Sequence, residues 1–225
     1  MTKIEGLNLK INKFFRIKFS NARRNKIIND DFTIISNNCW GGMIYESYNL
    51  EKKTPTVGLF FTSKDYLKFI SNLKYYLSLK LEFIDYNNSK NIDFLAENDI
   101  KKNIIIGVLD DIEIYFLHYK NPEEAFDKWE RRKKRINYQK IIFKFNDQNG
   151  CNLDDLNTFL NLPYKNKIFF TVKNWKINNQ SIIKIFQLIN KKYILASHEP
   201  FGNNIQFNVN KFINYLSTED YFNDI

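Results

Sequence analysis

The sequence predicts an α/β protein with a mixed, mainly parallel sheet or sheets flanked by helices, and with one antiparallel hairpin. Short apolar runs rich in β-branched residues alternate with helix-like segments, which is typical of α/β folds. Two apolar runs, 103–108 and 112–119, are separated by a turn of three residues, which predicts the hairpin. The 225 residues are 44% hydrophobic and 26% charged, so the chain can bury a large core.

The first 28 residues form a segment with its own composition. They hold eight basic residues against the single acid Glu5, which accounts for +7 of the net charge of +9. Leu7, Ile11, Phe14 and Phe15 recur at helical spacing between these cations. We therefore expect a basic amphipathic helix over 1–28 and an α/β domain over 29–225. A polar stretch near 86–102 leaves open a division of that domain into two subdomains.

The basic helix has two interpretations. A basic helix with phenylalanines on one face is typical of a segment that rests on an anionic membrane, here expected for residues 7–28. The same pattern also fits a surface helix that packs its phenylalanines against the domain. Lys13, Arg16 and Lys18 interrupt the apolar residues, so a signal peptide is not expected, and no run approaches the ~20 residues that span a bilayer.

A cytoplasmic protein, with peripheral contact to the inner membrane face as the membrane alternative, is therefore expected. Cys39 and Cys151 would then be free thiols. Because most of the excess charge lies in the N-terminal segment, the sequence argues against a nucleic-acid partner.

The first half of the domain predicts a strand at 32–36, a polar turn at 37–42 and a short helix at 43–48. A second strand follows at 57–61. Ser63 is the expected N-cap of a helix whose apolar stripe runs from Tyr66 to Leu77. Short strands are predicted at 81–84 and 92–95, followed by the hairpin.

In the second half, Asn121 is expected to cap a helix with Pro122 in its first position, which runs to about residue 135. Asn152 is expected to cap a short helix that ends near residue 160. Further strands are predicted at 140–146, 167–172 and 192–196, while 181–189 fits either a helix or a strand. Asn208 begins a final helix that ends near residue 216.

The turn after the first strand is the first candidate site, because ligands of α/β sheets bind beyond the carboxyl ends of strands. Asn37 and Asn38 suit sugar hydroxyls, Trp40 suits stacking, and Gly41 and Gly42 let backbone N–H groups approach an anion. The alternative is a glycine turn with Trp40 in the core. The segment matches neither a dinucleotide fingerprint nor a Walker A motif, so no cofactor is identified.

Cys39, His118 and Asp147 are the candidate catalytic residues. Cys39 precedes a predicted helix, whose N-terminus favours a thiolate nucleophile, and its base would be His118 or His198. Asp147 follows a strand, where it suits a base or a metal ligand. The alternatives are an inert buried cysteine, a structural imidazole and an ordinary Asn-Asp-Gly turn. One carboxylate does not make a metal site, and none is predicted.

The basic end of the helix at 122–135 is the second candidate ligand site. Arg131 and Arg135 share a helix face, and Arg132 lies beside them. Guanidinium groups suit a diphosphate or a carboxylate. A solvated basic helix end is the alternative.

Four segments together resemble the bacterial DUF1919 family, whose members are often labelled exopolysaccharide biosynthesis proteins. They are Ser-Asn-Asn-Cys-Trp-Gly-Gly at 36–42, Pro-Thr-Val-Gly-Leu-Phe at 55–60, Trp-Glu-Arg-Arg at 129–132 with Arg-Ile-Asn at 135–137, and Asp147 with Gly-Cys at 150–151. The resemblance covers roughly residue 31 to the C-terminus. At 146–150 the sequence departs from the more charged Asp-Arg-Asp-Gly of the family, which makes a second acid there doubtful.

The resemblance implies a compact α/β protein encoded among capsule, exopolysaccharide or lipooligosaccharide genes. We therefore expect a transferase that acts on a surface glycan or its lipid-linked precursor and uses a nucleotide-activated donor. The partners would be a sugar nucleotide or another anionic diphosphate ligand and a glycan acceptor. The alternative is a non-catalytic sugar- or nucleotide-binding accessory protein of the assembly machinery.

Overall fold

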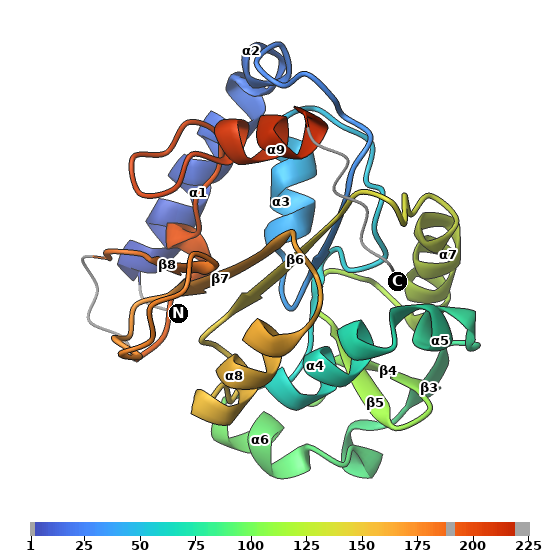
Figure 1. The fold of residues 1–225 in the computed structure, drawn as a ribbon. Helices are drawn as coiled ribbons and strands as arrows, with labels where there is room; N and C mark the ends of the chain where they lie inside the picture. The colour runs from blue at the N-terminus through green and yellow to red at the C-terminus, as the bar shows by residue number, and fades with distance from the viewer. Residues whose placement is uncertain (1–2, 188–191, 219–225) are drawn as a thin grey trace.

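The computed structural model describes residues 3–187 and 192–218, which form two four-stranded sheets with helices around them (Figure 1). The first sheet is parallel and has the order β1-β6-β7-β8. Its strands are β1 (Thr33–Ser36), β6 (Ile141–Asn146), β7 (Lys167–Thr171) and β8 (Ile182–Lys184). The second sheet is antiparallel and has the order β2-β5-β4-β3. Its strands are β2 (Leu59–Phe60), β3 (Glu82–Ile84), β4 (Ile105–Leu109) and β5 (Ile112–Phe116).

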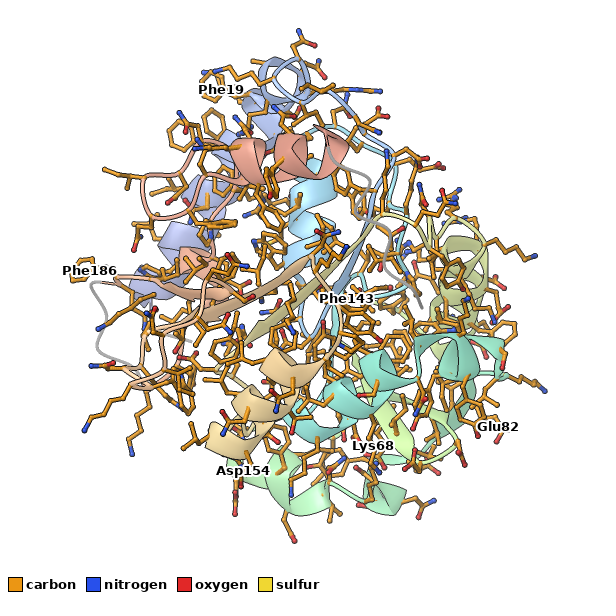
Figure 2. All side chains as sticks on the ribbon, in the orientation of Figure 1. Phe19, Lys68, Glu82, Phe143, Asp154 and Phe186 are labelled. Carbon is orange, nitrogen blue, oxygen red and sulfur yellow. The ribbon has the colours of Figure 1, made fainter. Side chains whose placement is uncertain are left out.

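The parallel sheet is covered on both faces. Helices α3 (Trp40–Ser47) and α9 (Val209–Thr218) pack on the face that carries Ile34, Ile142 and Phe170. Helices α4 (Ser63–Ser71) and α8 (Leu153–Asn161) lie against the opposite face, which carries Phe143 and Phe145 (Figure 1). Because side chains alternate along a strand, β6 contributes to both cores. Figure 2 shows Phe143 in the interior of the molecule.

The antiparallel sheet is inserted in the chain between β1 and β6, whose strands are neighbours in the parallel sheet. The predicted hairpin is confirmed as β4 and β5, and β2 and β3 extend it on either side. Its inner face shares a core with the parallel sheet and with α5 (Leu73–Ser78) and α7 (Pro122–Lys133). Its outer face is covered by α6 (Ile92–Glu97) and the preceding turn η1 (Tyr86–Asn88). The mixed α/β fold class predicted from the sequence is thus confirmed.

The N-terminal segment forms two helices, α1 (Lys3–Lys18) and α2 (Ser20–Arg24). Helix α1 contacts α3 and the short turn η2 (Ala196–His198). The buried Arg16 makes an ion pair with Glu46 of α3, with 3.1 Å between Nε and Oε2. This contact fixes which side of α1 faces the domain.

The predicted caps are confirmed for three helices. The side chain of Asn121 accepts a hydrogen bond from Glu124 N at the start of α7, and Asn152 forms a reciprocal capping box with Asp155 at α8. Asn208 accepts from Lys211 N at 2.9 Å immediately before α9. At α4 the prediction was one residue late, because Thr62 is the N-cap and Ser63 begins the helix.

Several predicted boundaries are wrong. The segment 37–42 is not all turn, because α3 begins at Trp40 and includes both glycines. Residues 92–95 form a helical turn of α6, not a strand. The 181–189 segment contains the three-residue strand β8, with residues 188 and 189 outside the described residues. Residues 192–196 form no strand and lead into η2. Short apolar runs do not distinguish these states, so tertiary packing decided them.

Candidate functional site

The carboxyl ends of β1 and β6 meet in a buried polar centre. Lys144, in the middle of β6, is fully buried on the α3 face of the sheet. Its ammonium group donates to Asn38 Oδ1 at 2.9 Å and to Glu199 Oε1, and it lies 5.7 Å from the ring centroid of Phe170. Glu199, just after η2, is also buried. A buried ion pair therefore lies under the strand ends.

Amide side chains surround this ion pair. Asn38 and Asn146 each donate an Nδ2 hydrogen to Glu199 Oε1, at 3.0 and 2.8 Å. Asn37 donates to Asn146 Oδ1 at 2.8 Å. Gln148 Oε1 accepts from both Asn38 and Asn146, at 3.3 and 3.2 Å, and is the half-exposed member of the group. We call these six side chains the polar centre: Asn37, Asn38, Lys144, Asn146, Gln148 and Glu199.

Two oxygen atoms of the polar centre have no hydrogen-bond partner among the described residues. They are Asn37 Oδ1 and Glu199 Oε2, and both are buried. A buried acceptor without a donor costs on the order of 1–3 kcal/mol. Both atoms are acceptors, so any group that pairs with them must be a hydrogen-bond donor. Gln148 marks the side on which the network approaches solvent.

The ion pair is held in a desolvated environment. Burial lowers the pKa of Lys144, and the Glu199 carboxylate opposes that shift. Burial and the nearby Glu199 charge raise the pKa of Cys39 to about 12. The Cys39 thiol contacts the carbonyl of Leu59 at 3.8 Å. At neutral pH the thiol is protonated, which is the opposite of what a cysteine nucleophile requires.

Asp147 ties three segments together. One carboxylate oxygen accepts from Thr171 Oγ1 at 2.6 Å and from Val172 N at 2.9 Å, and the other accepts from Ile194 N at 2.6 Å. These bonds hold the end of β7 and the segment before η2 beside β6. In the structure the Asp147 carboxylate therefore holds these segments in place next to the polar centre. Among the residues that the structure describes, no cluster of potential ligands suits a metal ion.

Trp40, Gly41 and Gly42 lie in the first turn of α3. The indole of Trp40 is buried, donates to Pro200 O at 2.8 Å and packs on Phe170. It therefore lies beneath the polar centre and positions the segment that carries Glu199. Ser36 Oγ accepts from Gly41 N at 3.2 Å, and Asn38 Oδ1 accepts from Trp40 N at 3.1 Å. Side chains of the domain itself thus accept the N–H groups of Trp40 and Gly41, two of the donors expected to face an anion.

His118 and the arginines lie to one side of this centre. His118 is exposed, and its Cβ packs against Gly58. Arg132 is buried and donates to Tyr119 OH at 2.8 Å. Arg131 is exposed, and Arg135 pairs with Glu51 at 2.8 Å between Nη2 and Oε1. Of the three arginines, Arg132 alone points toward the loops beside Cys39: Tyr119 OH donates to Val57 O, and the Val57 side chain lies against Gly42.

Sequence reasoning missed Lys144 and Glu199. A lysine at a central position of an otherwise apolar strand was a signal for the first, because the α3 face of that strand is buried. Glu199 lay in a segment without secondary-structure pattern. A cavity of about 380 Å³ lies at the opposite edge, near the starts of β7 and β8, and none of the predicted site residues lines it.

The fold and the polar centre define an α/β protein with a buried network of polar side chains at the carboxyl ends of its parallel strands. The chain belongs to the family described as Domain of unknown function (DUF1919), which matches residues 10–222. A protein of Haemophilus influenzae with the name "Uncharacterized protein" is 29% identical over 173 residues, which are 77% of each chain. Among the described residues, no helix has the length and apolarity needed to cross a bilayer.

Proposed function

We propose that this protein is a transferase that acts on a surface glycan or its lipid-linked precursor and uses a nucleotide-activated donor. The observation that carries the proposal is the pair of buried acceptors, Asn37 Oδ1 and Glu199 Oε2, within a network of amide side chains. Amides and carboxylates are the groups that recognise sugar hydroxyls. Their location beyond the carboxyl ends of parallel strands is where α/β proteins bind ligands.

In the proposed reaction Glu199 acts on the acceptor hydroxyl. Its Oε2 accepts the hydroxyl proton while the hydroxyl oxygen forms a bond to the transferred group. The bond between that group and the donor breaks, and the leaving group takes the electron pair. Lys144 holds the carboxylate through Oε1, and Oε2 has no hydrogen-bond partner among the described residues. Because Oε2 is buried, the proposed reaction requires the acceptor hydroxyl to enter from the side of Gln148. The transferred group is a glycosyl, acyl or phospho-substituent.

Ligand screening tests the proposal. Thermal-shift measurements would compare sugar nucleotides, acyl-CoA, CDP-linked donors and free glycans. Gln148→Leu removes the half-exposed acceptor and should abolish the shift with the glycan ligand, whereas Gln139→Leu, an exposed glutamine elsewhere, should leave it unchanged. Equal shifts in the two variants would contradict a site at the polar centre.

Turnover separates a transferase from an accessory protein. Glu199→Gln should retain ligand binding and lose at least a hundredfold in rate, in the range expected for a lost general base. A protein that binds a glycan ligand, shows no turnover with any donor and copurifies with another assembly protein would instead be the accessory component.

We further propose that α1 rests on the inner face of an anionic membrane. Its outward face carries large apolar side chains that are 43–58% exposed, together with lysines. The apolar residues are Leu7, Ile11, Phe14, Phe15 and Ile17, continued by Phe19, which Figure 2 shows at the edge of the molecule. Lys18 lies over the rings of Phe14 and Phe19. Apolar side chains flanked by cations are typical of helices at anionic surfaces.

The same helix borders the proposed site, since α1 contacts η2, immediately before Glu199. A membrane-borne acceptor would thus be close to the polar centre. Sedimentation with vesicles of neutral and anionic lipid tests this. Phe14→Glu should reduce binding to anionic vesicles at least tenfold, and Leu153→Glu, at a similarly exposed site on α8, should not. Equal binding to neutral and anionic vesicles, or no binding to either, would contradict the proposal.

A further inference from the structure

A second site lies between α7 and the segment that follows α3. Its central residue is Arg132, which is 7% exposed. One guanidinium nitrogen, Nη1, donates to Tyr119 OH, and no carboxylate among the described residues bonds this side chain. The other two guanidinium nitrogens, Nε and Nη2, make no hydrogen bond to the described residues. They are also not fully buried, so they are open to solvent. A nearly buried arginine therefore keeps free donors that a solute can reach.

Lys52 is the second cation of this site. Glu51, the residue before Lys52, pairs with Arg135 and so holds this part of the chain against the end of α7. Lys52 itself is half-buried, and no described acid bonds its ammonium group. The pairing of Glu51 with Arg135 thus sets Lys52 beside the end of α7 that carries Arg132. Burial lowers the pKa of Lys52, and the charges of Arg132 and Lys128 lower it further.

The acids near this cluster already have partners. Glu46 is the acid that acts on Lys52, and it is bonded to Arg16 at 3.1 Å. Lys128 is paired with Glu124 at 2.5 Å and lies 5.3 Å from the Tyr119 ring centroid. Arg132 and Lys52 thus carry two positive charges, partly desolvated, with no bonded acid among the described residues. Like charges that lose water in this way favour the binding of an anion.

We infer that Arg132 and Lys52 bind a phosphate or diphosphate group. A guanidinium fork contacts two oxygens of a tetrahedral oxyanion, and an ammonium group supplies a point charge to a third. Tyr119 OH accepts from Arg132 and donates to Val57 O, so it holds the guanidinium in one orientation. Tyr119 is a positioning residue at this site.

This site deepens the proposed function. The anion class follows from Arg132 and Lys52, whereas its identification as the phosphate group of the donor rests on the proposed function. The location fits that role because Tyr119 packs on Gly58, next to Leu59, whose carbonyl contacts Cys39 beside the polar centre. Arg131 and Arg135, which the sequence grouped with Arg132, are not part of the site.

Titration calorimetry of the full chain with inorganic pyrophosphate tests the inference, and adjacent residues provide matched controls. Arg132→Lys keeps the charge but loses the two-pronged contact, so pyrophosphate affinity should fall at least tenfold, whereas the exposed Arg131→Lys should change it less than twofold. Lys52→Gln should also weaken binding at least fivefold. Lys53→Gln should not, since Lys53 is paired with Asp31 at 2.7 Å.

The two pairs of variants keep the test decisive. If Arg132→Lys fails to fold, the comparison of Lys52→Gln with Lys53→Gln decides the outcome. No pyrophosphate binding by the unmodified chain at millimolar concentration, or equal losses within both pairs, would overturn the inference. The titration contains no glycan and needs no turnover, so its failure leaves the role of Glu199 to the turnover assay.

Discussion

Lys144 and Glu199 are the residues whose environment differs most from what their side chains prefer. A lysine and a glutamate rarely enter a core unless they are paired, and here each is the charged partner of the other. The bond from Lys144 to Asn38, and those from Asn38 and Asn146 to Glu199, satisfy further hydrogen-bonding groups of the pair. Such a pair specifies one arrangement of the strand ends.

Lys144→Met should therefore destabilise the protein by about 3–5 kcal/mol, because it leaves the Glu199 charge buried without its partner. Adding Glu199→Gln should restore part of this loss, since the neutral amide removes that charge. Urea unfolding measures both effects. A double variant no more stable than Lys144→Met would show that the charge of Glu199 is not the cause.

His118 offers a prediction about pH. Desolvation by the surrounding loops lowers its pKa below 6.5, and the positive charge of Lys13 lowers it further. The folded state thus binds the proton less well than the unfolded state. The stability that His118 contributes is present above about pH 6.5 and is lost as the pH falls through the lowered value.

Proton NMR of the two histidines should show that His118 titrates below pH 6.5 and that Lys13→Gln moves its midpoint upward. His118→Gln should also lose less stability than the unmodified protein between pH 7.5 and 5. A midpoint at or above 6.5 would contradict the desolvation of His118, and an unchanged midpoint in Lys13→Gln would contradict the influence of α1 on this loop.

At the scale of elements, α3 owes its position to two glycines. A Cβ on Gly41 would lie 3.1 Å from Ile34 Cγ2 and from Ser36 Oγ, and a Cβ on Gly42 would lie 2.9 Å from Val57 Cγ1. Neither glycine requires an unusual backbone angle, because both lie within the helix. They are needed so that α3 can approach β1 and the segment at residue 57.

Gly42→Ala tests this close approach. Alanine gains up to about 1 kcal/mol in helix propensity, but the crowding with Val57 should cost about 1–3 kcal/mol, so the variant should be less stable. In a Val57→Ala background the same change should become neutral or stabilising. Denaturation of the four proteins of this cycle gives the coupling, and equal effects of Gly42→Ala in both backgrounds would contradict the contact.

At the scale of the whole molecule, the two sheets are joined by one hydrophobic core. Ile35 and Phe143 of the parallel sheet belong to the same cluster as Leu59 and Ile114 of the antiparallel sheet. Trp129 of α7 is also part of this cluster, whereas Trp40 packs in the separate core under α3 and α9. A perturbation in either sheet is therefore expected to reach the other.

We predict a single cooperative unfolding transition. Two chains would be made, one that keeps only Trp129 and one that keeps only Trp40, with the other tryptophans replaced by Phe. In each chain the urea midpoint from tryptophan fluorescence should equal the midpoint from far-UV circular dichroism. Within either chain, a fluorescence midpoint that differs from the circular dichroism midpoint would indicate two units that unfold separately.

Local chemistry was enough to predict much of the fold. The caps at Asn121 and Asn152, the hairpin of β4 and β5 and the strand β6 follow from short-range hydrogen bonding and apolar patterning. The sequence also predicted that polar residues 37, 38 and 147 would lie at strand ends, because the carboxyl ends of parallel strands share one edge. Residues 92–95 were misassigned because four apolar and polar residues fit a helical turn as well as a strand.

By itself, therefore, the sequence determined the α/β class, most helices and strands, the charge of α1 and the family resemblance, all of which depend on local pattern or composition. Only the tertiary structure decided which polar groups act together. Glu199 reaches Lys144 across 55 residues, and the pairing of Glu51 with Arg135 sets Lys52 beside the end of α7 that carries Arg132. Such meetings depend on how α3, α7 and the segment after β8 pack around the sheet, and no periodicity along the chain encodes them.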